Sequence, residues 1–429
     1  MKILFITNLY PPNIVGGYER LCFDVVSGLA ARGHQTIVLT SDYGGKEDGF
    51  RGQRVERSLK LFATNGNIYQ PFECAPEDRA AINAHNSETL VKIVERDQPQ
   101  VVFVWNLYFL DPSLLETIER LKLSIVYFLT DNWLIAFLNP VFIQDYFARK
   151  VFGSQIEPVF DATIKGWTKG QGNPSFRIRG HAIFASRFMR DLYTEAGFRF
   201  KGNAVIYHGV NLPERPGIDF VDRRQFIQDG EIRLLVAGRI VEIKGVHTAI
   251  EALSLVSRML PDIKLRLTIL GNDQDRPYLQ KLHDQIAQLG VSNMVDFAMP
   301  VAEDELFELF QNHDIYLFPS LYEPFSLTLI HALNAGIPTV ASSVGGNPEI
   351  VHDMQTGMLF SKNHAQELAG AVVKLATDDI MRQSISENAR NVAHRYTFEH
   401  MLVEVEHILK KWNEDFYNRR RWAIWKMFQ

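Results

Sequence analysis

Short apolar runs alternate with helical patterns along most of the chain. Such runs recur at 3–7 (ILFIT), 100–105 (QVVFVW) and 123–129 (LSIVYFL), and amphipathic stretches separate them. Runs of this length are typical of strands in a parallel sheet, because such strands are covered by helices on both faces. The repeated order of strand, helix and strand therefore predicts an α/β fold.

A stretch rich in proline, glycine and charge interrupts this pattern at 213–230. A new apolar run opens directly after it, at 232–236 (IRLLV). We therefore expect two Rossmann-like domains, at 1–213 and 231–397, joined by this linker. The tail at 398–429 has a helical pattern.

The stretch 319–349 alternates polar loops with apolar elements. Its first loop follows a short strand-like run (DIYLF), so Glu323 lies just past the end of a strand. A helix is expected from Pro324 to Ala335, with Gly336 as its left-handed cap. The stretch ends in a glycine-rich loop, whose backbone amides we expect to approach a ligand closely.

The start of this helix predicts an anion site. Its first backbone N–H groups, those of Phe325, Ser326 and Leu327, are expected to be unpaired donors at a positive helix end. Glu323 would stand beside a bound phosphate and accept hydrogen bonds from a group rich in hydroxyls. His331 lies two turns further along and would reach the far end of the same ligand, or it is a helix histidine satisfied by its neighbours. A sugar attached to a diphosphate suits these groups.

The first strand of the second domain leads into a further set of charges. Gly238 lets the chain turn at the strand end, and Arg239 and Lys244 are spaced so that their side chains converge. Two cations neutralise the charge that grows on a leaving diphosphate as a glycosidic bond breaks. The alternative is a pair of solvated charges in a loop, but the strand before and the helix after favour the phosphate clamp.

Two loops of the first domain also follow strands. Gly16 and Gly17 form a loop at the first turn of a strand–helix–strand unit, where phosphates bind in many α/β proteins. Asp131 comes directly after the strand 123–129, between Thr130 and Trp133. Its carboxylate is placed to accept the proton of an acceptor hydroxyl as a general base, or it caps the following segment through backbone N–H groups.

The segment from Glu323 to His331 resembles the signature of retaining GT-B glycosyltransferases of family four, the glycosyl transferases group 1. In that family two glutamates bracket the nucleotide sugar. Glu323 matches the first, which holds the hydroxyls of the donor sugar. His331 replaces the second, which grips the ribose, and Ser326 stands where glycine is common. Arg239 and Lys244 match the family's phosphate-clamping arginine and lysine.

Other positions of the resemblance surround the same cleft. The glycine pair 16–17 and the acidic Glu19 match a loop near the donor phosphates and the acceptor. Thr130 occupies the place of a histidine that approaches the reacting sugar, and Asp131 keeps the aspartate that follows it. Met299 stands where family members often carry a glycine beside the nucleobase.

The resemblance implies two Rossmann-like αβα domains that face one another across a cleft, with the last helix, about 398–429, packed back on the first domain. It also implies a metal-independent, cofactor-free hexosyltransferase of polysaccharide or glycoconjugate biosynthesis. Such an enzyme moves a sugar from a nucleoside diphosphate sugar to a hydroxyl of a sugar, lipid-linked or small-molecule acceptor. The alternatives are a GT-B phosphorylase or epimerase, and a non-catalytic sugar-nucleotide-binding protein of a glycan assembly complex.

Composition adds limits to this picture. The formal charge of −5 gives no general case for nucleic-acid binding. Two cysteines, Cys22 and Cys74, without metal-type spacing suit a reducing compartment. No window approaches the ~20 apolar residues of a membrane helix, so a cytoplasmic protein is expected. The aromatic residues within 139–179 are mixed with lysines and arginines, a pattern that can bind sugars, lipids or a partner, but ordinary core is the preferred interpretation. Basic and aromatic residues at 419–428 allow peripheral contact with the inner face of a membrane, although packing on the first domain is preferred.

Overall fold

The protein divides into two compact α/β units. The computed structural model describes residues 1–14, 16–45, 49–62, 76–153, 175–212, 230–272, 275–302 and 305–427, without the side chains from 420 onward. Unit 1 consists of Met1–Lys150, Ser154–Tyr207 and Met401–Gln429, and unit 2 of Val151–Gly153 and His208–His400. Cys74, most of the predicted linker, the second half of the aromatic segment and the basic side chains of the tail beyond 419 lie outside the described residues.

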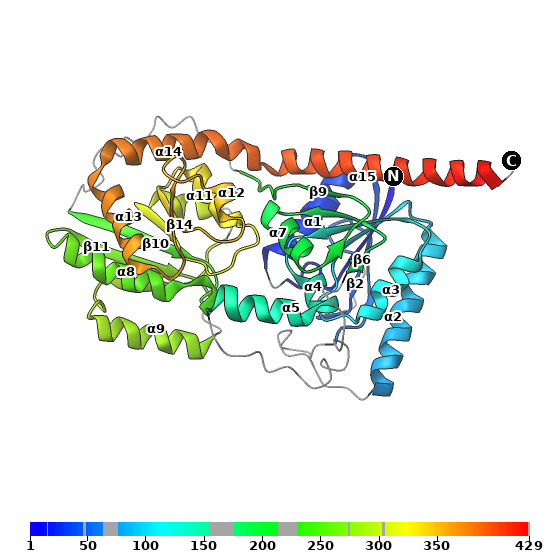
Figure 1. Cartoon of the computed structure of the whole chain (residues 1–429), viewed down its shortest axis with the longest axis horizontal. Helices are drawn as coiled ribbons and strands as arrows, with labels where there is room; N and C mark the ends of the chain where they lie inside the picture. The colour runs from blue at the N-terminus through cyan, green and yellow to red at the C-terminus, as the bar shows by residue number, and fades with distance from the viewer. Residues whose placement is uncertain are drawn as a thin grey trace. The chain divides into compact units, whose positions relative to one another are not determined.

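Within the described residues, unit 1 is built on one large parallel sheet of seven strands (Figure 1). In spatial order the strands are β3 (Val55–Leu59), β2 (Gln35–Ser41), β1 (Lys2–Thr7), β4 (Val101–Asn106), β5 (Ser124–Leu129), β7 (His181–Phe184) and β9 (Asn203–Val205). The central strands β1, β4 and β5 are buried along nearly their whole length, as expected for strands covered on both faces. Strands β6 (Phe176–Arg177) and β8 (Phe198–Arg199) form a separate small parallel sheet.

Helices connect the strands of unit 1, and most of the last helix of the chain also belongs to this unit. They are α1 (Gly17–Ala31), α2 (Pro76–Asp97), α3 (Pro112–Arg120), α4 (Trp133–Leu138), α5 (Pro140–Asp145), a π-helix (Tyr146–Val151), α7 (Arg187–Glu195) and α15 (Phe398–Met427). Glu406 of α15 forms ion pairs with Arg32 at 2.8 Å and with His34 at 2.9 Å. Trp412 stacks on His181 with ring centroids 4.5 Å apart. These contacts attach α15 to the strand and helix ends of unit 1.

Unit 2 has a second parallel sheet, with six strands among the described residues. Their spatial order is β12 (Val295–Ala298), β11 (Lys264–Leu270), β10 (Glu231–Ala237), β13 (Ile315–Phe318), β14 (Thr339–Ser342) and β15 (Met358–Phe360). Alternate residues of β10, from Ile232 to Val236, enter a core shared with the helices that follow. Because side chains alternate between the two faces of a strand, Ile232, Leu234 and Val236 share one face of the sheet.

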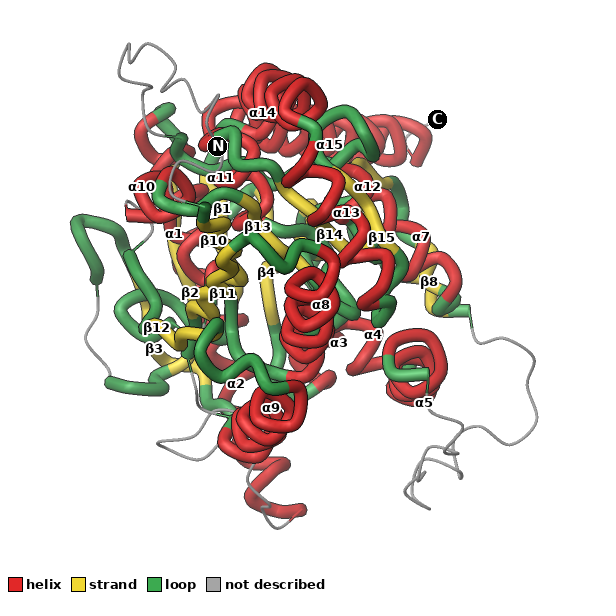
Figure 2. The backbone as a smooth tube through the Cα atoms, turned by 90° about the vertical axis from the view of Figure 1, so that its left-hand side faces the viewer, coloured by secondary structure: helices red, strands yellow, loops and turns green. Residues whose placement is uncertain are grey.

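The helices of unit 2 pack in two groups. They are α8 (Val246–Met259), α9 (Arg276–Leu289), α10 (Leu306–Gln311), α11 (Leu327–Ala335), α12 (Asn347–Ile350), α13 (Ala365–Thr377) and α14 (Asp379–Ala393), with short 3₁₀ turns at Glu242–Lys244 and His394–Tyr396. Helix α8 packs against α9 and α13, whereas α11 packs against α10 and α14 (Figure 2). No helix in the described part of the chain is long and apolar enough to span a membrane.

Candidate functional site

The order of strands creates a ligand-binding position in the sheet of unit 2. Strand β10 has β11 on one side and β13 on the other, so the connections after β10 and β13 leave the sheet in opposite directions. Ligands of open α/β sheets bind at the carboxyl ends of strands at such a switch point. Arg239 and Lys244 follow β10, and Glu323 follows β13, so all three predicted residues lie at this position.

Two of these residues form an ion pair. The Lys244 Nζ donates to Glu323 Oε2 at 2.6 Å, and the Glu323 residue is only 8% exposed. The ammonium also lies 5.7 Å from the centre of the Phe318 ring. Lys244 and Glu323 were predicted to hold different parts of a ligand, the diphosphate and the sugar. In this structure they form an ion pair with one another.

Backbone contacts hold the two loops together beneath this pair. Leu321 donates its N–H to the Ile243 carbonyl at 2.8 Å. Gly245 has φ +65, and a Cβ there would lie 2.0 Å from the Pro319 carbonyl oxygen. Only glycine allows both this left-handed conformation and this close approach. The loops that carry Lys244 and Glu323 are therefore fixed to one another by main chain.

Arg239, in the same loop as Lys244, is exposed, whereas Glu323 is buried. Its side chain makes no hydrogen bond or ion pair to the described residues of this structure. The chain reaches it through Gly238, which has φ +151, and a Cβ on the neighbouring Gly271 would lie 1.9 Å from the Gly238 carbonyl oxygen. The turn at Gly238 is thus packed closely against the end of β11. It presents a guanidinium that is ready for an anionic ligand.

The predicted start of the central helix was wrong by three residues. Helix α11 begins at Leu327, not at Pro324, because Ser326 is the N-cap and its Oγ accepts from the Leu329 N–H at 3.2 Å. The first helical amides are therefore those of Leu327 and Thr328, which have no acceptor in a preceding turn. Pro324 and Phe325 lie in the loop before the helix. The free helical amides that were expected at Phe325 to Leu327 are therefore those of Leu327 and Thr328.

The end of α11 and the glycine loop after β14 are also defined. Gly336 has φ +70 and caps the helix, as predicted. Gly346 donates its N–H to the Glu323 carbonyl at 2.9 Å, and a Cβ on Gly345 would lie 1.9 Å from that same oxygen. The Gly346 amide therefore supports the Glu323 backbone, and the approach of this loop's other amides to a ligand stays a prediction.

Two of the departures from the family pattern, His331 and Met299, differ in their exposure to solvent. His331 is buried on α11, at 5% exposure, and is not without a partner. Met299 follows the edge strand β12 and is 74% exposed. Their proposed contacts with ribose and nucleobase remain predictions.

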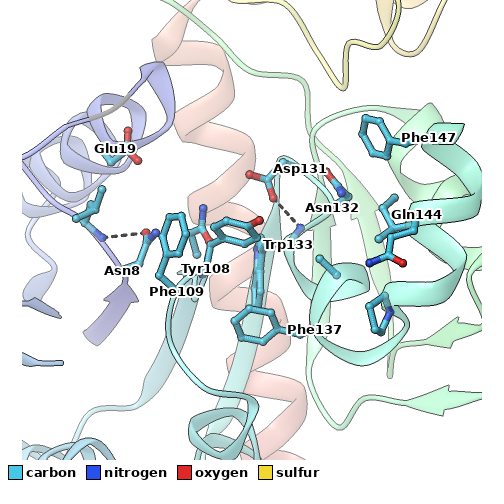
Figure 3. Close-up of a pocket in the computed structure, with 15 residues that line it drawn as sticks. Asn8, Glu19, Tyr108, Phe109, Asp131, Asn132, Trp133, Phe137, Gln144 and Phe147 are labelled. Atoms are coloured by element: carbon cyan, nitrogen blue, oxygen red, sulfur yellow. Dashed lines mark hydrogen bonds between the residues drawn. The ribbon is translucent and has the colours of Figure 1, made fainter. Parts of the chain in front are cut away.

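Unit 1 contains a pocket of about 680 Å³ at the corresponding position of its own sheet. Strand β1 has β2 on one side and β4 on the other, and Asn8, Leu9 and Asn106 at the ends of β1 and β4 line the pocket. The loop after β5 and helices α4 and α5 supply most of the remaining wall. Figure 3 shows Asp131 and Tyr108 together in the middle of this pocket.

Asp131 both caps a helix and faces the pocket. Its Oδ1 accepts from the Trp133 N–H at 2.9 Å at the start of α4 (Figure 3). Burial raises the pKa of Asp131 to about 6, opposed by the Trp133 hydrogen bond and assisted by the negative charge of Glu19. Asp131 therefore accepts from a backbone N–H at the start of α4 and also lines the pocket. A carboxylate that titrates near pH 6 is suited to take a proton at neutral pH.

The other predicted residues of unit 1 divide between the pocket and its support. Glu19 lines the pocket, and its Oε2 accepts from the Gly16 N–H at 2.9 Å, which closes the first turn of α1. Trp133 also lines it. Gly16, Gly17 and Thr130 are not among its lining residues, and the Thr130 hydroxyl is buried without a hydrogen-bond partner in the described structure.

The sequence did not reveal the aromatic wall of this pocket. Tyr108 and Phe109 come from the loop after β4, and Phe137 from α4. Phe147 belongs to the aromatic segment that was expected to be ordinary core, and that expectation was wrong for this residue. Aromatic residues at helical spacing look the same in sequence whether they fill a core or line a pocket. The described residues contain no cluster of His, Cys, Asp and Glu that could hold a metal ion.

Comparisons with known proteins place these two units among sugar-transferring enzymes. Residues 15–214 match the family model Glycosyltransferase Family 4, and residues 218–392 match Glycosyl transferases group 1. The chain is 25% identical to an uncharacterised glycosyltransferase of Methanocaldococcus jannaschii, over 96% of this chain and 98% of the relative. It is 27% identical to the glycogen synthase of Mycobacterium tuberculosis, over 91% and 89% of the two chains. The structure of HepE from Anabaena, solved in complex with UDP-glucose, is similar with a TM-score of 0.65 and 19% identity, over 96% of this chain and all of that one.

Proposed function

We propose that this chain transfers a sugar from a nucleoside diphosphate sugar to an acceptor hydroxyl with retention of configuration. The two family matches and the shared architecture support a glycosyltransferase of the GT-B fold. The observation that carries this proposal is the ion pair of Lys244 with the buried Glu323 at the switch point of unit 2, with the exposed Arg239 in the same loop after β10. This set combines two cations for a diphosphate with one carboxylate for sugar hydroxyls.

The donor would exchange partners within this set. A diphosphate attracts Lys244 and Arg239, because each phosphate oxygen accepts charge-assisted hydrogen bonds. Once Lys244 turns to the phosphate, the Glu323 carboxylate is left to accept from the hydroxyls of the sugar. The two cations then stabilise the negative charge of the departing diphosphate, which is the largest electrostatic demand of the transition state. The amides of Leu327 and Thr328 add donors at the helix end.

The acceptor would use the pocket of unit 1. Asp131 is proposed to take the proton of the attacking hydroxyl, because its raised pKa brings its charge change close to neutral pH. His331 is proposed to bind the ribose, and Met299 to lie beside the base. The complex of HepE with UDP-glucose supports a nucleotide sugar as the donor class.

The proposal is tested first by titration calorimetry with UDP, GDP and ADP. The matching nucleotide sugars follow, with release of the diphosphate measured over time. Micromolar binding of one nucleotide and slow hydrolysis of its sugar conjugate would identify the donor. Binding of none of the three would leave a non-catalytic protein as the better account of this fold.

A variant separates binding from chemistry. Glu323→Ala is expected to lower donor turnover by at least ~10²-fold, because it removes the carboxylate proposed to hold the reacting sugar. Nucleotide affinity should stay within a few fold, because the cations remain. Glu251→Gln, at an exposed position of α8, is the matched control and should behave as the unchanged protein. Unchanged turnover in Glu323→Ala would remove this residue from the mechanism. The anomeric configuration of the product, followed by NMR, tests retention.

A further inference from the structure

The polar groups that line the pocket of unit 1 are neutral or acidic. Two carboxylates, Glu19 and Asp131, face it. Four amides line it as well: Asn8, Asn106, Asn132 and Gln144. None of its described lining residues is a lysine, an arginine or a histidine. A site for a phosphorylated or carboxylated ligand needs cations or convergent backbone amides, so this lining favours a neutral ligand.

Part of this hydrogen-bonding capacity is unused within the described structure. The side chains of Asn132 and Gln144 make no hydrogen bond to a described residue, and only one of the two carboxylate oxygens of Asp131 accepts from a described residue, the Trp133 N–H. The indole Nε1 of Trp133 is buried without a partner, on a residue that is 2% exposed. Carboxylates accept from hydroxyls, whereas amides and indoles also donate to them. Closely spaced hydroxyls are the complement of such a set.

The apolar part of the lining is largely aromatic. Tyr108 is 43% exposed although it belongs to a pocket wall, and its ring contacts Phe109 edge-on at 4.4 Å between centroids. The pKa of Tyr108 is raised by partial burial and by the charge of Asp131, which places the ring close to that carboxylate. An exposed ring beside acceptors offers a flat surface on which the C–H face of a pyranose can lie.

The backbone holds this ring in a strained turn. Asn106 Oδ1 accepts from the Tyr108 N–H at 2.7 Å, and Phe109 has φ +66, a conformation that costs a bulky residue free energy. The Phe62 N–H donates to the Phe109 carbonyl at 2.7 Å and keeps the turn in place. Such strain persists where surrounding structure enforces it, often at ligand-binding positions.

We propose that this pocket takes a neutral carbohydrate as the acceptor, stacked on Tyr108, and that the two carboxylates reject phosphorylated and carboxylated sugars. The proposal rests on the proposed function and narrows it, because it names the class of acceptor. Asp131 and Glu19 act in two ways. They accept from the hydroxyls of a neutral sugar, and their charge repels an anion in a pocket whose described walls offer no cation to offset it.

The test measures binding to the whole protein before it measures transfer. Saturation-transfer NMR and calorimetry at low salt compare methyl α-glucoside, methyl α-mannoside and myo-inositol with glucose 6-phosphate, mannose 6-phosphate and glucuronate. We expect at least one neutral sugar to bind at least ~10-fold more tightly than its anionic counterpart. The gap should shrink as salt is added, because screening weakens the repulsion. Anionic sugars that bind as well as the neutral ones, or better, would overturn the proposal.

Two variant pairs locate the effect. Tyr108→Ala should weaken binding of the neutral sugar by ~10-fold, whereas Tyr108→Phe, which keeps the ring, should weaken it by less than ~3-fold. Glu19→Gln, which still accepts from Gly16, should raise the relative affinity for the anionic sugar by ~5-fold or more. Equal losses in both Tyr108 variants would refute the stacking role. An unchanged ratio in Glu19→Gln would refute the electrostatic one.

Failure of this proposal and failure of the proposed function give different results. A protein that hydrolyses a nucleotide sugar but binds only anionic acceptors remains a glycosyltransferase, and the neutral-acceptor proposal is then wrong. A protein that binds no nucleotide but binds neutral sugars at Tyr108 has the predicted pocket without the predicted transfer. If no neutral sugar of the panel binds or accepts transfer while an anionic one does, the pocket has been assigned the wrong class of ligand.

Discussion

Replacing Gly345 by alanine tests how Glu323 is held without changing any charged group. Gly345 has φ +56, and an added Cβ would lie 1.9 Å from the Glu323 carbonyl oxygen. Real Cβ contacts are not shorter than 3.0 Å, so the two loops must separate by about 1 Å. The oxygen belongs to the backbone and cannot rotate away as a flexible side chain would. The variant therefore displaces the residue proposed to bind the donor sugar.

The expected cost has two parts. The left-handed conformation costs alanine ~1–2 kcal/mol relative to glycine. The forced contact adds ~1–3 kcal/mol, which is typical of overpacking in a close-packed region. The free energy of unfolding should thus fall by ~2–5 kcal/mol. Donor turnover should fall by ~10²-fold, because a displacement of about 1 Å in a reacting group has that effect.

Gly290→Ala is the matched control for this variant. Gly290 caps α9 with φ +69, and a Cβ there would meet nothing within 4 Å. It should lose only the conformational ~1–2 kcal/mol and keep full turnover. Urea unfolding and diphosphate release measure the two quantities on the same preparations. Equal stability and equal turnover in the two variants would show that the contact with Glu323 does not position it, and the argument from close packing would be refuted.

Three further predictions concern single charges. In the unchanged protein kcat/KM should rise with pH through about 6, the pKa of Asp131, because a general base acts only when it is deprotonated. Asp131→Asn should lose this pH dependence. This variant should also be more stable at pH 7 by up to ~3 kcal/mol, since a raised carboxyl pKa means that the charged form destabilises the folded state. A profile unchanged in Asp131→Asn would assign the step elsewhere. Glu406→Ala should lower the free energy of unfolding by ~1–3 kcal/mol at neutral pH, because its ion pairs with Lys410 and Arg32 are lost. The pKa of Glu406 is lowered to about 2, so its contribution to stability should fade as the pH falls from 4.5 towards 2. Urea unfolding of the unchanged protein at several pH values measures this loss. A variant as stable as the parent would mean that these pairs are fully screened. Arg239→Ala should raise the Kd for the nucleoside diphosphate by ~10-fold or more in calorimetry and leave stability within ~0.5 kcal/mol, because the side chain is exposed; unchanged affinity would exclude it from the clamp.

The sheet framework followed from the sequence because apolar runs and their spacing record it directly. The runs at 3–7, 100–105 and 123–129 correspond to β1, β4 and β5 with shifts of one residue at most. Polar groups that come just after a strand could also be placed, because parallel strands end at a common edge. This is why Lys244 and Glu323 could each be placed just past the end of a strand, although the ion pair between them was not predicted.

The helix start and the glycine loop could not be read in the same way. Proline at a first helical turn and serine at an N-cap are both favourable, and the sequence offers them two residues apart at Pro324 and Ser326. Ser326 becomes the N-cap because its Oγ accepts from the Leu329 N–H, and the side chain of Pro324 has no acceptor to offer. Gly346 likewise gives its amide to Glu323, a partner from a distant loop that no local pattern announces.

The pocket of unit 1, which we propose as the acceptor site, shows why a site for a neutral ligand is harder to predict than a site for a diphosphate. A diphosphate demands cations and helix amides, and these leave recognisable signs in the sequence. A neutral sugar demands rings and amides, which every protein contains. Tyr108, Asn132 and Phe147 become a site only when three separate segments meet around Asp131. The charge of Asp131 is costly in such a place, as its raised pKa records, and the hydrogen bond from Trp133 offsets only part of that cost. A carboxylate kept at a position that penalises its charge is better explained by a proton-transfer or ligand-binding role than by the helix cap alone, since asparagine would cap the same N–H without the penalty.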